Sequence, residues 1–299
     1  MIHEFAVEPE VMATWNHFRV LWDDFGVSQG RFLVEYPGNW RKRVYALAEK
    51  LSAPVRANAI CSKLGDREQR HRLVGARGRS FEEGRGGWIE NATANHGTDG
   101  GFRAIVARSG VAGRPDVIAA DELERYAPPW KVERQDKACP RHATEMCRRV
   151  SALLRHSQEL VLVDRNFDPG EPRFANPFEG LVGSRADWRR PELHTAKPEP
   201  FVSDVQESKY RRNLELSVPA GASLVVCFWP GLPDGERLHP RFVLTERGGV
   251  HFDYGLDEGP GTTLVSLLEH EVFLRLWSEY RPDCRVFGTP ELVTVAGRG

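Results

Sequence analysis

The spacing of hydrophobic residues predicts alternating helices and strands in the second half of the chain. Continuous apolar runs at 159–164 and 222–229 are typical of buried strands. A further strand is expected near 192–196, and apolar residues at helical spacing predict helices over 141–156, 174–182, 202–214 and 263–280. This order of elements predicts a mixed α/β fold.

The segment 238–259 has the pattern of a β-hairpin: an apolar strand, a Gly-Gly turn, a second short strand and a glycine-bounded loop. Alternation along the first strand places His239 and Arg241 on one face, about 7 Å apart, and Glu246 on the other. An imidazole beside a guanidinium on a strand could form a site that binds and cleaves a phosphodiester. The imidazole can attack phosphorus or move a proton, and the guanidinium can bind phosphate oxygens with two donors.

The spacing His239-x-Arg241-x4-Glu246, followed by glycines, resembles the His-x-Lys-x4-Asp motif of the phospholipase D superfamily. Arginine replaces the lysine of that motif and glutamate replaces its aspartate. The variant is also similar to the phospholipase D-like domain found carboxy-terminal to MIT modules, which is noted for membrane binding, and to its bacterial relatives. The resemblance implies a phospholipase D-like α/β/α sandwich in the second half of the chain.

The resemblance also implies catalytic roles. His239 would be the nucleophile or the acid, Arg241 the phosphate ligand and Glu246 the orienting carboxylate, with no metal and no cofactor. A bulge would be needed to bring Glu246 to the face of His239; otherwise Glu246 only braces the hairpin. Three further residues are candidates for substrate binding by their position: Asp164, Arg165 and Lys209.

The family mechanism needs a second histidine. A symmetric homodimer would bring His239 of each copy to the axis, as in single-motif members of the family. His251, on the return strand, and His270, on the closing helix, are the alternatives within one chain. The same His-x-Arg-x4-acid spacing recurs at His17, where helical periodicity over 9–25 favours a structural role.

Residues 1–128 are expected to form a smaller α+β region that contacts a partner or nucleic acid. Residues 129–299 are expected to form the second domain. Strands are expected at 31–36, 101–108 and 116–120, and a helix at Trp40–Leu51. The polar, glycine-rich stretch 65–101 predicts long loops with one strand near Trp88 and Ile89. Pro128-Pro129-Trp130 and the charged residues after it predict a linker.

Composition narrows the class of protein. The 299 residues include 41 basic and 42 acidic ones, so the net charge of −1 argues against a uniformly basic nucleic-acid binder. Five scattered cysteines argue against a disulfide framework, and Cys139, His142 and Cys147 lack the paired spacing of a zinc site. Neither a signal peptide nor a long apolar run is evident, so a cytoplasmic protein with no transmembrane segment is expected.

Two functions remain open. The first is a metal-independent phosphodiesterase or nuclease, a hydrolase acting on nucleic acid at a dimeric site, in a bacterial restriction or phage-defence (antiviral defence) setting. The second is a catalytically inactive phospholipase D-like module that serves as a scaffold subunit of a defence or DNA-processing complex, or binds phospholipid. Replacement of the lysine and aspartate favours the inactive module, whereas retention of His239 beside Arg241 favours chemistry.

Overall fold

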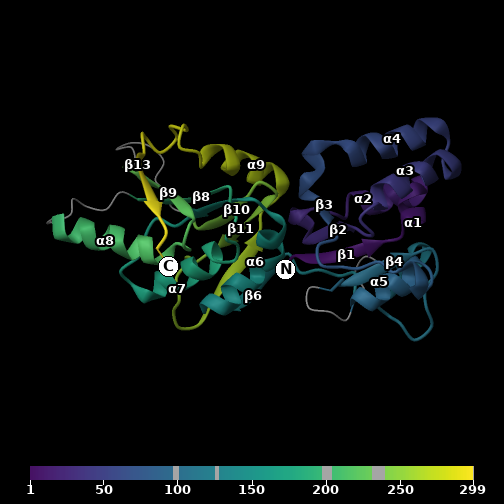
Figure 1. The fold of residues 1–299 in the computed structure, drawn as a ribbon, viewed down its shortest axis with the longest axis horizontal. Helices are drawn as coiled ribbons and strands as arrows, with labels where there is room; N and C mark the ends of the chain where they lie inside the picture. The colour runs from purple at the N-terminus through teal and green to yellow at the C-terminus, as the bar shows by residue number, and fades with distance from the viewer. Residues whose placement is uncertain (97–100, 125–127, 197–203, 231–239, 299) are drawn as a thin grey trace. The chain divides into compact units, whose positions relative to one another are not determined.

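The computed structural model describes residues 1–96, 101–124, 128–196, 204–230 and 240–298. The chain divides into two compact units, Ile2–Glu133 and Arg134–Gly299. Each unit is built on its own sheet with helices packed against it (Figure 1), so both units belong to the α/β class.

The first unit contains a five-stranded parallel sheet in the order β3-β2-β1-β4-β5. The strands are β1 His3–Val7, β2 Arg31–Glu35, β3 Leu73–Gly75, β4 Ala104–Ala107 and β5 Val117–Ala119. The expectation of an α+β region was wrong, because β1 and β3 had no recognisable pattern and complete a parallel sheet. In such a sheet, ligands bind at the carboxyl ends of the strands.

The helices of the first unit are α1 Pro9–Ala13, α2 Trp15–Trp22, α3 Trp40–Leu51, α4 Pro54–Gly65 and α5 Trp88–His96. The prediction of α3 is confirmed, and the helix expected over 9–25 divides at Thr14, which has an extended backbone. The strand expected near Trp88 was wrong. Asn91 and Asn95 lie one helical turn apart and donate to the carbonyls of Glu82 (3.0 Å) and Ser80 (2.9 Å), which fixes α5 against the preceding loop.

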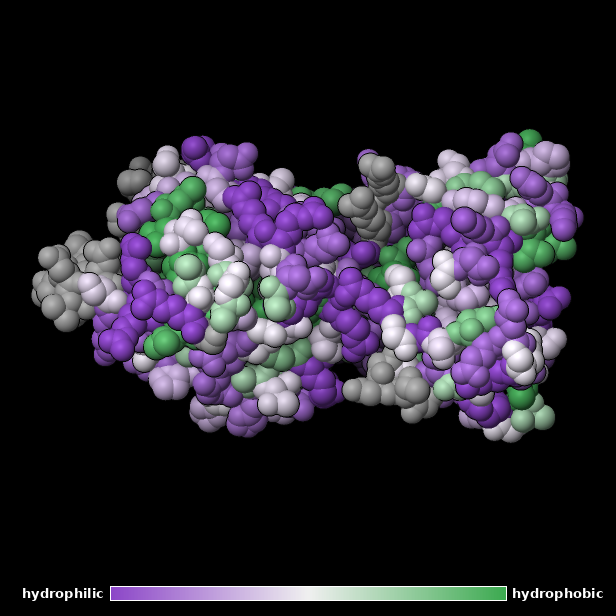
Figure 2. Space-filling model, viewed as in Figure 1, coloured by the Kyte–Doolittle hydropathy of each residue, from purple (hydrophilic) through white to green (hydrophobic). Residues whose placement is uncertain are grey.

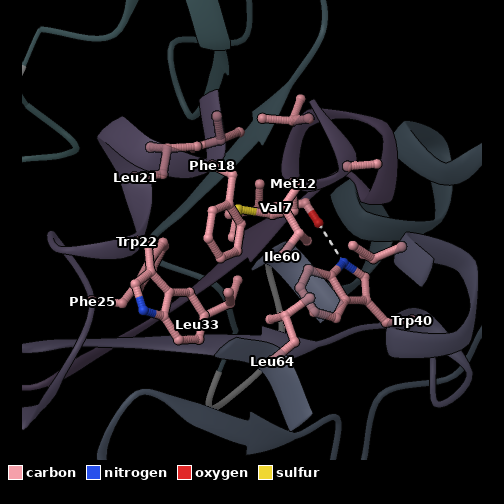
Figure 3. Close-up of a cluster of buried hydrophobic side chains, with 14 of the residues drawn as sticks. Val7, Met12, Phe18, Leu21, Trp22, Phe25, Leu33, Trp40, Ile60 and Leu64 are labelled. Carbon is pink, nitrogen blue, oxygen red and sulfur yellow. Dashed lines mark hydrogen bonds between the residues drawn. The ribbon is translucent and has the colours of Figure 1, made fainter. Parts of the chain in front are cut away.

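Helices α1 to α4 share one hydrophobic core with the sheet (Figure 3), and α5 lies on the other side of the sheet (Figure 1). The indole of Trp40 donates a hydrogen bond to the carbonyl of Val7 at 2.7 Å, which ties α3 to the end of β1. Trp130, expected in the linker, packs in this core, with its ring 5.0 Å from that of Phe5. The first unit therefore extends past the proline pair.

The second unit contains an eight-stranded mixed sheet among its described residues, in the order β13-β9-β8-β7-β10-β11-β12-β6. The strands are β6 Gln135–Pro140, β7 Glu159–Val163, β8 Arg190–Ala196, β9 Ser223–Trp229, β10 Phe242–Thr245, β11 Gly248–Phe252, β12 Thr262–Leu267 and β13 Glu291–Ala296. Strands β7, β8 and β9 are parallel, and the other pairs are antiparallel.

The helices of the second unit are α6 Ala143–His156, α7 Pro172–Val182, α8 Asp204–Ser217 and α9 His270–Glu279. The first three confirm the predicted helices to within a few residues. The helix expected over 263–280 was half wrong, because Thr263, Val265 and Leu267 alternate as buried residues and form β12. Helix α9 begins after this strand and packs with β7, β9 and β10 in a second core.

The order of the strands corrects one further expectation. From the sequence, the apolar runs 159–164 and 222–229 predict neighbouring strands that end at Asp164 and Trp229, with the hairpin beside Trp229. Both follow strands of one sheet, but β8 separates β7 from β9, and the hairpin pairs with β7 through Phe242 opposite Val163. The hairpin therefore lies beside Asp164.

The surface of both units is polar over most of the face in view, with hydrophobic side chains in small groups between the polar ones (Figure 2). No helix of the described residues is long and apolar enough to cross a membrane.

Candidate functional site

The candidate site lies at the carboxyl end of β7, where the parallel part of the second sheet meets the hairpin. Asp164 directly follows β7 and is only 1% exposed. Its carboxylate accepts hydrogen bonds from the backbone N–H groups of Asn166 (2.9 Å) and Leu256 (2.8 Å). Arg241 directly precedes β10, and continuing the pairing of Phe242 with Val163 by one residue places it beside Asp164.

Two arginines at this edge lack hydrogen-bond and ion-pair partners among the described residues. Arg165 and Arg241 are both half-buried, and neither side chain forms a hydrogen bond or ion pair with a residue that the structure describes. The backbone of Arg165 is fixed, since its carbonyl accepts hydrogen bonds from Ala196 N–H (3.3 Å) and Thr195 Oγ1 (3.2 Å). The Nε of Arg241 is buried without a partner. Because burying an unpaired polar group costs free energy, these guanidinium groups are suited to an anionic ligand.

The loop that follows β11, residues 253–261, closes one side of the site. Its Asp257 is buried and binds the guanidinium groups of Arg141 (2.9 Å) and Arg173 (3.5 Å). Its Glu258 accepts a hydrogen bond from the N–H of Ala143 (2.8 Å), the first residue of α6. The 253–261 loop is thereby attached to the starts of both α6 and α7.

Gly255 allows this loop to pass between two buried acids. A Cβ at this position would lie 2.7 Å from the carboxylate of Asp257 and 3.3 Å from that of Asp164. Its φ of +142° also lies in a region that L-residues rarely adopt. Glycine is therefore required here, and the two carboxylates lie on either side of it.

Burial and neighbouring charges set the protonation of the site. Burial raises the pKa of Asp164, and the carboxylate of Asp257 raises it further, while the two backbone hydrogen bonds and Arg241 oppose the shift. Burial lowers the pKa of His251, Asp253 opposes that shift, and Arg241 adds to it. His251 therefore stays neutral to lower pH than a free histidine, as a proton acceptor requires.

The sequence-predicted residues do not all gather here. Arg241, Asp164 and Arg165 lie together at the carboxyl end of β7, while His239 lies outside the described residues. Lys209 is exposed on α8 and forms no hydrogen bond or ion pair with this group in the described part of the chain.

Glu246 lies at the other end of the hairpin. Its carboxylate accepts hydrogen bonds from the backbone N–H groups of Gln158 (3.0 and 3.1 Å) and Glu159 (3.0 Å), at the amino end of β7. Five residues of strand separate it from Arg241, or about 17 Å. The carboxylate of Glu246 therefore braces the hairpin, which is one of the two alternatives that the sequence left open.

The hairpin turn itself also differs from the expectation. The turn is Glu246-Arg247, and Gly248 and Gly249 begin β11. A Cβ on Gly249 would lie 2.5 Å from Leu244 and 2.7 Å from Leu268, so glycine serves close packing rather than the turn.

The other histidines divide between the two ends of the hairpin. His251 pairs with Phe242, their rings 5.4 Å apart, near the Arg241 end. His270 follows Leu267, which pairs with Val250 near the turn end. His17, on α2 of the first unit, binds Asp121 at 2.8 Å, in agreement with a structural role.

Among the described residues, one group has the donors and spacing for a metal ion: Glu192, His194 and Cys227, all fully buried. The indole of Trp229 donates to Nδ1 of His194 at 3.0 Å, so Nε2 carries the proton and donates to Glu192 at 3.0 Å. A metal would need the lone pair that this proton occupies. Burial raises the pKa of the Cys227 thiol to about 12, which further disfavours a thiolate ligand. The group is a hydrogen-bond network of the core.

Sequence reasoning missed three charged residues of the site: Arg141, Arg173 and Asp257. Their ion pairs join positions 116 and 84 residues apart, so no local spacing reveals them. The available signal was the pair of glycines, Gly255 and Gly259, on either side of Asp257.

Comparison with known proteins adds no assignment, because no family model, curated protein or solved structure matches the chain. The functional interpretation therefore rests on the chemistry of the site.

Proposed function

We propose that the second unit binds and hydrolyses phosphodiesters of nucleic acid, without a metal, at the carboxyl end of β7. The observation that carries the proposal is the pair of half-buried arginines, Arg165 and Arg241, that lack partners among the described residues. A phosphodiester group supplies the anionic oxygens that planar guanidinium groups bind with two donors.

In the proposed reaction the imidazole of His239 attacks phosphorus. A nitrogen–phosphorus bond forms and the ester bond to the leaving oxygen breaks, with the proton for that oxygen coming from a second histidine. The second histidine, now neutral, takes a proton from water as the water oxygen bonds to phosphorus, and the nitrogen–phosphorus bond breaks to release His239. Arg165 and Arg241 neutralise the non-bridging oxygens in both steps. The second histidine comes from a partner copy in a homodimer. His251, the alternative within one chain, is the poorer donor, because burial lowers its pKa and because it pairs with Phe242, on the opposite face of the sheet from Arg241.

A second function is favoured by one observation. The carboxylate of Glu246 accepts hydrogen bonds from two backbone N–H groups at the amino end of β7, at the opposite end of β10 from Arg241. A module that binds phosphate without cleaving it, as a scaffold in a defence complex or on phospholipid, needs only the arginines.

Cleavage of plasmid, single-stranded DNA and RNA by EDTA-treated protein distinguishes the two functions. The nuclease proposal predicts cleavage that survives chelation and falls by several orders of magnitude in His239→Ala, with binding retained. Arg241→Ala weakens binding and reduces the salt slope by about 1, as for the loss of one phosphate contact. Arg148→Ala, at an exposed arginine on α6 that pairs with Glu145, is the matched control and leaves both unchanged.

Activity that requires magnesium, or a His239→Ala protein as active as the parent, overturns the nuclease proposal. Binding that depends on Arg241 without any cleavage supports the scaffold function instead.

A further inference from the structure

Tyr254 is an aromatic side chain presented to solvent from a firmly held loop. It is 63% exposed. Its N–H donates to Thr263 Oγ1 at 3.2 Å, and the N–H of Asp253 donates to the carbonyl of Leu264 at 3.0 Å. On its other side the loop is held by Leu256 N–H on Asp164. The ring is therefore displayed without the freedom of a flexible loop tip.

A guanidinium lies over the ring of Tyr254. The guanidinium of Arg141 lies 5.3 Å from its centroid and is itself held by the buried carboxylate of Asp257. Arg141 also packs against Gly259, where a Cβ would lie 2.8 Å from the guanidinium carbon. Since the ring remains largely exposed with Arg141 over it, much of its π surface is open to a ligand.

Tyr254 is close to the unpaired arginine. The N–H of Phe252 donates to the carbonyl of Arg241 at 3.0 Å, and Tyr254 follows Phe252 by two residues, or about 7 Å of extended chain. A phosphate bound by Arg241 would thus have an aromatic platform within reach of the base attached to the neighbouring sugar.

We infer that Tyr254 stacks against a nucleobase and that the ligand of this site is single-stranded nucleic acid. The inference rests on the proposed function and specifies its substrate class. Aromatic platforms beside basic grooves bind unpaired bases of any sequence, because every base has a π face. In a duplex the bases are stacked on one another and must be unpaired before they can reach such a ring.

The test measures the binding of the full-length protein to two labelled probes of equal length: a single-stranded oligonucleotide and its abasic counterpart, which carries the phosphates without the bases. The parent protein is expected to prefer the base-bearing probe. Tyr254→Ala should weaken binding of that probe by about 5- to 100-fold and leave the abasic probe unaffected, because stacking on one base accounts for a difference of this size. Tyr254→Phe and Tyr254→Trp should retain the preference. Leu274→Ala, at an equally open position on α9, is the control.

The outcomes separate the two proposals. If Arg241→Ala weakens both probes but Tyr254→Ala changes neither, phosphate binding stands and the stacking inference is wrong. If Tyr254→Ala weakens both probes equally, the residue supports the loop and the inference is also wrong. If neither probe binds the parent protein, the proposed function fails and the inference fails with it.

Discussion

Both units have arginines near the carboxyl ends of their parallel strands, but the arginines differ in their partners. In the first unit, the arginines that follow β2, β3 and β4 are each bound by a carboxylate: Arg41 by Glu35 (2.6 Å), Arg79 by Glu4 (2.5 Å) and Arg108 by Glu8 (3.1 Å). In the second unit, Arg165 and Arg241 have no such partner among the described residues.

The difference indicates which sheet edge is available to a ligand. At the first edge these three guanidinium groups are already bound, so an anion would have to displace a carboxylate from them. The second edge holds two guanidinium groups whose burial is not offset by a partner. Both sheets have the topology that suits a ligand site, but of these five arginines the two at the second edge are the ones without a carboxylate partner in the part of the chain that the structure describes.

The largest expected effect comes from breaking a pair of the first edge. The side chains of Arg79 and Glu4 are both 4% exposed, so Arg79→Met removes the guanidinium that binds a buried carboxylate. We expect the free energy of unfolding of the first unit to fall by about 3–5 kcal/mol. Urea titration followed by tryptophan fluorescence measures it, and Arg148→Met, which breaks the exposed pair with Glu145, should cost less than about 1 kcal/mol. Equal effects of the two substitutions would contradict the contrast between buried and exposed pairs.

The next largest effect on stability is expected in the 253–261 loop, at the second edge. Gly255→Ala introduces a Cβ between two carboxylates at a φ of +142°, and we expect a loss of about 1–3 kcal/mol. The change should appear as faster amide exchange of the 253–261 loop and weaker nucleic-acid binding. Gly261→Ala is the matched control, since it also has a positive φ but no atom within 4 Å of a Cβ. Equal effects of the two substitutions would mean that backbone strain alone matters.

Local pattern predicted the elements and failed to predict the contacts between them. Helix α3 and strand β7 follow from periodicity, because each buries one continuous set of side chains. Helix α5 was missed because the hydrogen bonds of Asn91 and Asn95 to a preceding loop, rather than an apolar stripe, define it.

The site shows the same limit. The sequence pointed to Arg241, Asp164 and Arg165, because strand ends are local features. It placed Glu246 in the site through motif spacing, although the ends of β10 face opposite edges of the sheet. Asp257 joins the site through ion pairs to residues far away in the chain, which no local pattern contains.

Because Arg241 has no ion-pair partner among the described residues, we expect its replacement to change the free energy of unfolding less than that of Arg79, and in the opposite direction. Arg241→Met removes a half-buried guanidinium and breaks no ion pair among the described residues. Asp164 loses the favourable charge of this neighbour. We expect the stability of the second unit to be unchanged or to rise by up to about 1 kcal/mol while nucleic-acid binding is lost, as at functional sites that are held at a cost in stability. A loss comparable to that of Arg79→Met, measured in the same titration, would show that Arg241 has a structural partner and would remove the contrast between the two edges.

The smallest effect concerns the pH dependence of stability and follows from the same guanidinium. The pKa of His251 is lowered below 6.5 by burial and by Arg241, with Asp253 opposing. The unfolded chain therefore takes up a proton near pH 6.5, whereas the folded chain does so only at lower pH. The contribution of His251 is fully present above pH 6.5 and is lost as the pH falls through its folded pKa. The stability of the parent relative to His251→Asn should thus decrease between pH 7.5 and 5, by a fraction of the roughly 1.4 kcal/mol that corresponds to each unit of pKa shift.

Hydrogen exchange of β10 and β11 amides measures this decrease, and His17→Asn is the control in the first unit. In an Arg241→Met background the decrease should become shallower, because one cause of the shift is gone. If Arg241→Met leaves the pH dependence of stability unchanged, the charge of this guanidinium is already neutralised. The arginines of the second edge would then be paired like those of the first.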